Sequence, residues 1–392
     1  MRFMKVSGLP LVAIMLSLSA CGGDDGGAVQ VAPMGASSET VAIAAPAPSV
    51  APSSTVVSDD AAATVTSAAT AATAVYPMLR GINIAGGEFG SNAPGRMNTD
   101  YIYPTKAEID YYANLGFKII RVPFKWERIQ PTLNGALSVA DQQAIRTVIT
   151  NATARGMTVV LDMHNYGQRA TGSNYQTMVN VGTTQVPGSA LADAWIKLAY
   201  EYRYNGSVWL GLMNEPHTMN AATWWPIVKK LVVDIRAAGL WNKLLVPGTA
   251  WTGAHSWVSS GNAASYNGFT DPANNFALEV HQYLDADSSG TSATCVAGSG
   301  TRVAEVINWS KSKGGVKLFM GEMGATSGTQ CGIEYRDMLN RMEASGVFRG
   351  WTAWGGGSWW PSSYIFRTLP LAWPNTATPT PHMKYLLEYV NK

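Results

Sequence analysis

The sequence predicts an α/β protein, folded as a (β/α)8 TIM barrel, on three observations. Eight short runs, each nearly all apolar, begin roughly 30 to 50 residues apart, as strands buried on both faces do. Segments with helical periodicity separate most of them, which predicts parallel strands joined by crossover helices. Eight such repeats within residues 76–392 favour a closed barrel. Residues 81–87, after the first run, lack the glycine spacing of a dinucleotide-binding loop.

The predicted elements follow in order along the chain. The eight strands are expected at Leu79–Ala85, Lys118–Phe124, Thr158–His164, Val208–Glu215, Lys243–Gly248, Phe276–Tyr283, Lys317–Gly324 and Phe348–Gly355. The helices are expected at Thr105–Leu115, Val139–Arg155, Ala190–Arg203, Thr223–Ala238, Val303–Lys311, Tyr335–Ala344 and Met383–Val390. Between the fifth and sixth strands the sequence shows no clear helix.

Residues 1–20 predict a signal peptide of the lipoprotein type. Arg2 and Lys5 precede an apolar run at residues 9–18 that is too short to span a membrane. The run ends in Leu-Ser-Ala-Cys, which resembles a bacterial lipobox and makes Cys21 a candidate for lipidation. An ordinary signal peptide with a chance cysteine is the alternative. Gly22, not Asp, follows Cys21, which resembles outer-membrane rather than inner-membrane sorting. We therefore expect an exported protein, either an outer-membrane lipoprotein or one secreted after tether cleavage.

Residues 21–75 have a different composition from the rest of the chain. After Cys21 they contain no Lys, Arg or aromatic residue, and Ala, Ser, Thr, Val, Gly and Pro dominate. Such a segment cannot bury enough apolar surface to offset its ordering entropy, so we expect a disordered tether. The predicted organisation is therefore a signal peptide, a tether, and a catalytic barrel over residues 76–392.

The overall composition limits the class of partner. The net charge is only +2, which gives no reason to expect nucleic acid binding. The 14 Trp and 16 Tyr favour a neutral substrate on which aromatic rings can stack. Besides Cys21, the chain has Cys295 and Cys331, and a pair of cysteines in an exported protein predicts one disulfide, with two free thiols as the alternative. Neither lies in a metal-binding pattern.

Polar residues gather at the predicted carboxyl ends of the strands, where such barrels place their chemistry. They are Arg121, His164, Asn214, Glu215, His217, His281, Tyr283, Glu322 and Trp354. Each has an ordinary structural explanation when taken alone: a first-turn acid, a core histidine, an ion-pair partner or a core tryptophan. Because all of them fall at the same end of one barrel, a functional site is the better explanation.

Two carboxyl groups that face each other across a pocket can hydrolyse a glycosidic bond. Glu215 and Glu322 provide such a pair, one to protonate the leaving oxygen and one to act at the anomeric carbon. Two neighbouring carboxyls do not ionise together easily, which keeps one of them protonated. A metal hydrolase is the rival interpretation, but the sequence lacks a dense cluster of ligands, so we expect no metal and no cofactor.

At these residues the chain resembles glycoside hydrolase family 5, a retaining family with catalytic glutamates at the ends of strands four and seven. The resemblance rests on Asn214-Glu215-Pro216 followed by Gly321-Glu322, and covers nearly all of the predicted barrel. The opening run Arg80–Gly86 and the run His281–Asp285 are similar to those of the family's endoglucanases. In that group a cysteine after the second run pairs with one past the nucleophile strand, which here implies a Cys295–Cys331 disulfide.

The resemblance also implies roles for individual residues. Glu215 would be the acid/base, Glu322 the nucleophile, and Asn214 the partner of the sugar 2-hydroxyl. The other implied roles are as follows: Arg121 and Tyr283 flank the nucleophile, His164 and His281 bind sugar hydroxyls or support the acid/base, Trp354 lies under the −1 sugar, and Trp251 lines the leaving-group side.

The sequence therefore predicts a retaining endo-β-1,4-glucanase that acts on cellulose or soluble β-glucan as a monomer. The same chemistry on mannan, xyloglucan or mixed-linkage glucan is the first alternative, and a glycan-binding surface lipoprotein without activity is the second. We find no carbohydrate-binding module in the sequence, so soluble or amorphous glucan is the expected substrate rather than crystalline cellulose.

Overall fold

The computed structural model of this protein describes residues 77–172 and 175–392. The predicted signal peptide, Cys21 and the tether at residues 21–75 lie outside the described residues. Within them, no helix is both long enough and apolar enough to cross a membrane.

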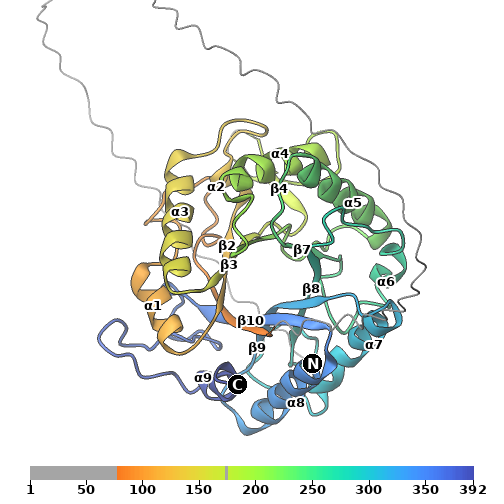
Figure 1. The fold of residues 1–392 in the computed structure, drawn as a ribbon. Helices are drawn as coiled ribbons and strands as arrows, with labels where there is room; N and C mark the ends of the chain where they lie inside the picture. Colours follow the sequence, from red (N-terminus) through yellow and green to blue (C-terminus); the bar gives the residue numbers. More distant parts are fainter. Residues whose placement is uncertain (1–76, 173–174) are drawn as a thin grey trace, which may run out of the picture. The chain divides into compact units, whose positions relative to one another are not determined.

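The core of the fold is a closed barrel of eight parallel strands, as the sequence predicts (Figure 1). Neighbouring strands pair in the order β1-β10-β9-β8-β7-β6-β3-β2. The barrel strands are β1 (Leu79–Ile84), β2 (Ile119–Phe124), β3 (Thr158–Met163), β6 (Val208–Gly211), β7 (Leu244–Pro247), β8 (Phe276–Tyr283), β9 (Leu318–Gly324) and β10 (Phe348–Gly356).

Helices surround this barrel (Figure 1). They are α1 (Lys106–Asn114), α2 (Trp126–Ile129), α3 (Val139–Ala154), α4 (Gly188–Ala199), α5 (Ala221–Ala237), α6 (Asn262–Ser265), α7 (Ala304–Ser312), α8 (Thr329–Ser345) and α9 (Met383–Val390). Two 3-10 turns, η1 (Tyr200–Tyr202) and η2 (Ser299–Val303), adjoin α4 and α7. The long helices α1, α3, α4, α5, α7 and α8 begin near the carboxyl end of the barrel and end near its amino end, because each connects one parallel strand to the next.

Several boundaries differ from the sequence prediction. The fourth barrel strand ends at Gly211 rather than at Glu215. The backbone N–H of Asn214 still donates to the Met163 carbonyl of β3 (2.8 Å), and the chain leaves the extended conformation at Glu215, whose φ is +41°. The predicted helix Ala190–Arg203 is divided into α4 and η1. The short helices α2 and α6 and the antiparallel hairpin β4 (Gln168–Thr171) and β5 (Thr177–Asn180) were not predicted, since elements of four residues carry little periodic signal.

The inside of the barrel is layered. One buried apolar cluster takes one residue from each of six strands: Ile119, Val160, Trp209, Leu245, Ala277 and Phe319. Side chains two positions apart on a strand point to the same face. The next inward positions on four of these strands are therefore Arg121, Asp162, Glu279 and Gly321. An apolar plug thus closes the barrel below a polar layer, and the polar layer forms the floor of the site.

Candidate active site

A cavity of about 670 Å³ opens at the carboxyl ends of the strands. Its lining includes both predicted catalytic glutamates and most of the predicted binding residues: His164, Glu215, Trp251, His281, Tyr283, Glu322 and Trp354. Arg121 and Asn214 are buried beneath them. The structure therefore brings every residue of the predicted site together at one end of the barrel, although they come from seven strands and the loops that follow them.

Arg121 on β2 is the centre of the polar layer. Its guanidinium is fully buried and lies within 3.1 Å of carboxylate oxygens of Asp162, Glu279 and Glu322. The contacts with Asp162 and Glu279 are ion pairs without hydrogen-bond alignment, whereas Nη1 donates to Glu322 Oε1 at 2.9 Å. One buried cation thus offsets several buried carboxylates, which would be costly to bury alone.

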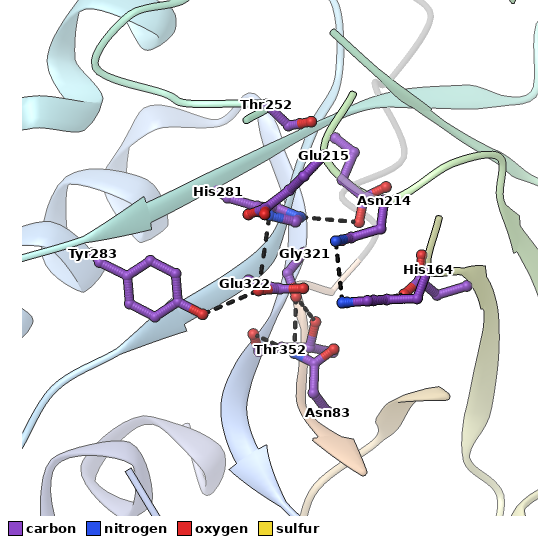
Figure 2. A network of polar contacts seen from close by, with 12 residues as sticks. Asn83, His164, Asn214, Glu215, Thr252, His281, Tyr283, Gly321, Glu322 and Thr352 are labelled. Carbon is purple, nitrogen blue, oxygen red and sulfur yellow. Dashed lines mark hydrogen bonds and ion pairs between the residues drawn. The ribbon is translucent and has the colours of Figure 1, made fainter. Parts of the chain in front are cut away.

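Glu322 on β9 is held at both carboxylate oxygens, and Figure 2 shows the contact with Tyr283. Arg121 donates to Oε1, and the Tyr283 hydroxyl donates to Oε2 at 3.0 Å. The preceding carbonyl, that of Gly321, accepts from Asn83 Nδ2 (2.9 Å) and from the Thr352 hydroxyl (2.6 Å). Residue 321 must be glycine because a Cβ there would overlap a Glu279 oxygen. The backbone and the side chain of Glu322 are therefore both fixed before any ligand binds.

Glu215 follows β6 in a strained backbone conformation. Its φ is +41°, in the left-handed region that non-glycine residues rarely adopt. This conformation turns the side chain toward His281, whose Nδ1 lies 2.7 Å from Glu215 Oε1 (Figure 2). The same His281 nitrogen is 3.9 Å from Glu322 Oε2. Ligand atoms of Glu215, His281 and Glu322 all lie within 4.8 Å of one another, so the two carboxyls face each other across a short gap.

The two buried histidines of the site differ in charge. Burial disfavours the charged form of His281, but the carboxylates of Glu322, Glu215 and Glu279 outweigh it and raise the pKa of His281 to about 10. Burial lowers the pKa of His164 to about 3, so its ring is neutral. Because Asn214 Nδ2 donates to His164 Nε2 (3.2 Å), His164 Nδ1 carries the hydrogen and donates to Asp162 (2.7 Å).

Asn214 is fixed by its neighbours as firmly as the glutamates. Its Oδ1 accepts from Arg121 Nη2 at 2.7 Å, and its Nδ2 donates to His164. With its carbonyl oxygen committed to the arginine, the orientation of the amide is set, and Nδ2 is the only end that can donate to a ligand.

A stacked pair of rings forms one wall of the cavity. Trp251 lies on His217 with a centroid distance of 3.5 Å and an interplanar angle of 4°, and it remains 53% exposed. Ala250, Trp251 and Thr252 all have φ near +56°, a left-handed turn that projects the indole from the end of β7. On the other side, Trp354 stacks on His164 with a centroid distance of 5.6 Å.

Only one group of three side chains in the described part of the chain could hold a metal ion: Glu215, His281 and Glu322. The raised pKa of His281 means that its ring carries protons on both nitrogens at neutral pH, so a metal ion would have to displace one. The arrangement suits acid/base chemistry between two carboxyls.

Comparison with known families identifies this arrangement. Residues 67–361 match the sequence profile described as cellulase (glycosyl hydrolase family 5). The chain belongs to glycosyl hydrolase family 5.

Relatives of this family 5 chain are endoglucanases. It is 33% identical to "Endoglucanase 1" of Robillarda sp. (strain Y-20), over 69% of this chain and 73% of the relative. It is 32% identical to "Endo-beta-1,4-glucanase B" of Aspergillus niger, over 74% of this chain and 84% of the relative. Among solved structures, an endo-beta-1,4-glucanase from Xanthomonas axonopodis pv. citri matches with a TM-score of 0.74 and 36% identity, over 80% of this chain and 98% of the other. The structure of XacCel5A in complex with cellopentaose matches with the same TM-score of 0.74, at 38% identity over 79% of this chain and 98% of the other.

The predicted disulfide is present in this family 5 chain and links two segments at the carboxyl end of the barrel. Cys295 lies in the segment after β8 and is bonded to Cys331 in the first turn of α8. Between β8 and Cys295, the Asp285 carboxylate accepts from the backbone amides of Gly290, Thr291 and Ser292, which folds this loop into the cavity wall.

Sequence reasoning missed several polar residues of the family 5 site. Asp162, Glu279 and Asn83 were given no role, although all three contact Arg121. A usable signal was present, because Glu279 lies two positions before His281 and Asp162 two before His164 within apolar strands. Alternation along a strand places each such pair on one face, and a carboxylate inside an apolar run indicates a buried partner of opposite charge.

Proposed function

We propose that this chain is a retaining endo-β-1,4-glucanase with Glu215 as acid/base and Glu322 as nucleophile. The separation of the two carboxyls carries the proposal. Their nearest oxygens lie within 4.8 Å. Retaining glycosidases hold the pair about 5–5.5 Å apart, whereas inverting enzymes leave about 6.5–9.5 Å for a water molecule between the two groups.

In the first step, Glu322 attacks the anomeric carbon while Glu215 gives its proton to the departing glycosidic oxygen. The nucleophile oxygens are oriented by Arg121 and Tyr283. His281, charged at neutral pH, donates from Nδ1 to Glu215 Oε1, which leaves the other oxygen to carry the transferred proton. The products are the shortened glucan with a free 4-hydroxyl and a glycosyl ester on Glu322.

In the second step, Glu215 acts as a base. It takes a proton from a water molecule, which attacks the anomeric carbon of the ester and releases Glu322. Two displacements at one carbon restore its configuration. The ion pair and hydrogen bond that hold Glu322 serve both steps, because the carboxylate must leave as readily as it attacks.

The rest of the cavity fits a neutral glucan. Asn214 Nδ2, which donates to His164 in this structure, is proposed to donate to the sugar 2-hydroxyl, and Trp354 in the cavity lining provides an apolar surface for the −1 sugar. Trp251, half exposed at the other wall, is proposed to stack on the leaving-group side. The bound cellopentaose of the similar XacCel5A structure and the names of the endo-β-1,4-glucanase relatives support β-glucan as the substrate. Mannan, xyloglucan and mixed-linkage glucan stay alternatives.

We also propose that the protein is exported and that Cys21 is acylated. The support is the basic, apolar and Leu-Ser-Ala-Cys order of residues 1–21. Mass spectrometry of the protein from its native host measures the acyl mass on an N-terminal Cys21. A mature chain that begins elsewhere in the leader, without lipid, contradicts the proposal.

The deciding experiment is proton NMR of the anomeric region during digestion of cellopentaose. If the β-anomer forms first and the α-anomer follows only by mutarotation, the enzyme is retaining. If the α-anomer forms first, the reaction inverts and the assigned pair is wrong. If cellopentaose is not cleaved but mannan or xyloglucan oligosaccharides are, the mechanism stands and the substrate changes. The same digestion with a chelator present is expected to proceed at an unchanged rate.

A second experiment separates an enzyme from a glycan-binding lipoprotein. Glu322→Gln keeps the shape of the side chain but removes the nucleophile, so turnover should fall by on the order of 10⁴-fold or more while polysaccharide binding persists. A wild-type chain that binds glucan without releasing any product supports the binding protein instead. Normal turnover by the variant shows that another residue is the nucleophile.

A further inference from the structure

The amino end of the barrel, opposite the cavity, has a strong excess of positive charge. The segments that lead from each helix into the next strand carry Lys118, Arg155, Arg203, Lys243, Lys313 and Lys317, and Lys392 follows α9. In the same segments of the described chain the only acidic side chain is that of Asp271. It is buried and bonded at both oxygens by Arg236, at 2.7 and 2.9 Å, so it does not offset the lysines. Of the other cations, Arg155 is paired with Asp110 of α1 at 2.7 Å.

Three of these basic residues and Arg349 of β10 line one depression on this face, together with the paired Asp271. Lys243, Lys313, Lys317 and Arg349 surround a hollow of about 540 Å³ beside the first residues of β7, β8, β9 and β10. The adjoining helices α5, α6 and α7 lie next to one another in Figure 1. The depression is therefore a feature of the folded barrel and is assembled from four separate strands.

The lysines of this depression contact neutral oxygens rather than carboxylates. Lys243 donates to Asn275 Oδ1 (2.8 Å), Lys313 to Asn267 Oδ1 (3.2 Å) and Lys317 to the Gly346 carbonyl (3.1 Å). Lys317 thereby stabilises the end of α8, as a cation at a helix C-terminus does. Lys243 and Lys313 instead contact side-chain amides, so attraction to a helix dipole does not account for their positions. Burial and then the neighbouring Arg349 lower the pKa of both Lys243 and Lys317, while Asp271 acts in the opposite direction on Lys243.

The route of the chain relates this face to the N-terminal segment. β1 begins at Leu79, and its first residue lies at the amino end of the barrel, as in every strand of a parallel barrel. The described chain therefore enters the barrel on the basic face, at residues 77–79. The predicted anchor at Cys21 precedes this end of the barrel in the sequence, and the cavity opens at the opposite end.

We propose that the amino end of the barrel is a docking surface for an anionic lipid membrane, with the depression at Lys243, Lys313, Lys317 and Arg349 receiving a lipid phosphate. This goes beyond the proposed hydrolysis and rests on the proposed lipid anchor only for the choice of a membrane as the anionic partner. One acyl chain binds a membrane weakly and reversibly, so a second, electrostatic contact would hold the enzyme at the surface. It would also orient the cavity toward the polysaccharide outside.

The test measures vesicle binding by the mature chain, residues 21–392, carrying Cys21→Ser so that no acyl chain can be added. We expect it to sediment with vesicles of equal parts phosphatidylglycerol and phosphatidylcholine but not with phosphatidylcholine alone, and to be released by added NaCl. The triple variant Lys243→Gln, Lys313→Gln, Lys317→Gln should bind on the order of a hundredfold more weakly, at about fivefold for each lysine.

The matched control removes three cations from the other end of the molecule: Arg96→Gln, Lys106→Gln and Lys384→Gln. It has the same net charge as the triple lysine variant and should keep most of the binding. Equal weakening by both variants, or no binding to the anionic vesicles, overturns the proposal. Lys313→Glu alone, at an exposed position, should also weaken binding, and unchanged affinity in this variant counts against the depression.

Cellopentaose hydrolysis is measured on every variant. All of them should keep wild-type activity, because none of the substituted residues lines the cavity, and this shows that they are folded. If vesicle binding fails while hydrolysis persists, only the docking surface is wrong. If hydrolysis fails in the wild type while vesicle binding follows the lysines, the proposed function is wrong and the docking surface stands.

Discussion

The two ends of the barrel differ in which residues adopt a positive φ. At the amino end, helices stop at glycines with positive φ and pass directly into the next strand: Gly156 (+68°), Gly239 (+80°), Gly314 (+78°) and Gly346 (+71°). At the carboxyl end, positive φ occurs in residues that disfavour it, among them Tyr166, Glu215 and Trp251. The amino end therefore follows local preference, whereas the carboxyl end departs from it.

This difference shows that the features that lower the stability of the fold are concentrated at the carboxyl end. A glycine after a helix satisfies the last carbonyls at little cost, so the amino end is assembled from favourable parts. Strained backbone and buried carboxylates at the carboxyl end persist only because the surrounding barrel holds them. Those same features orient Glu215 and Glu322. The end that contains the destabilising features is therefore the end proposed to carry out the chemistry.

After loss of the nucleophile, the largest effect on the rate is expected from loss of the proposed acid. Glu215→Ala should lower the rate on cellopentaose by about 10²–10⁴-fold, because protonation of the leaving oxygen is lost. On an activated aryl cellobioside, whose leaving group needs no proton, the first step should be nearly unaffected. The values of kcat/KM on both substrates, which report the first step, check this, and an equal loss of kcat/KM on the two would contradict the role of Glu215 as the acid.

Removal of the buried cation should be the most destabilising change. Arg121→Met leaves Asp162, Glu279 and Glu322 without their shared partner, and we expect a loss of about 3–5 kcal/mol in the free energy of unfolding. The matched control at the amino end is Arg80→Met, which breaks a partly exposed pair with Glu343 and should cost about 1 kcal/mol or less. Urea unfolding of both variants tests the comparison, which fails if the two losses are similar.

The disulfide should contribute next. Reduction of Cys295–Cys331 frees the loop after β8 from α8, and we expect a loss of about 2–4 kcal/mol and a lower melting temperature. Thermal unfolding with and without reductant measures it. The double variant Cys295→Ala, Cys331→Ala should melt at the lower temperature under both conditions. If the melting temperature of the wild-type protein is the same with and without reductant, the disulfide does not stabilise this end.

A pH-dependent effect is expected from Glu88 near the carboxyl end of β1. Burial raises its pKa from 4.5 to about 8, with the carboxylates of Asp162 and Glu322 adding to the shift. The folded state thus binds this proton more tightly than the unfolded state, so stability falls as pH rises from about 4.5 to about 8. Glu88→Gln should lack this fall and gain stability relative to wild type by up to a few kcal/mol. Denaturant unfolding at several pH values checks it, and parallel pH curves would contradict it.

The smallest effect is predicted at the amino end. Gly239→Ala forces alanine to adopt a φ of +80° with no neighbouring atom within 4 Å, so only backbone strain of about 1 kcal/mol should appear. Its kcat and KM on cellopentaose should match those of the wild type. A change in activity would show that the two ends are coupled more strongly than the barrel architecture indicates.

The sequence by itself determined the class of fold and the two glutamates. Apolar runs at regular spacing predict parallel strands, and parallel strands place their carboxyl ends together, so the convergence of Glu215 and Glu322 follows from order along the chain. The pairing of Cys295 with Cys331 was also accessible through the resemblance. These features depend on periodicity and motif, which one sequence contains.

Only the tertiary structure decided how the site is charged and held. Arg121 meets Asp162 and Glu279 across strands that are far apart in the chain, and the positive φ of Glu215 is imposed by the packing around it. The basic depression at the amino end likewise joins residues from four strands. Charge and strain are properties of distances in space, because Coulomb energy and desolvation depend on which groups surround a residue rather than on its neighbours in sequence.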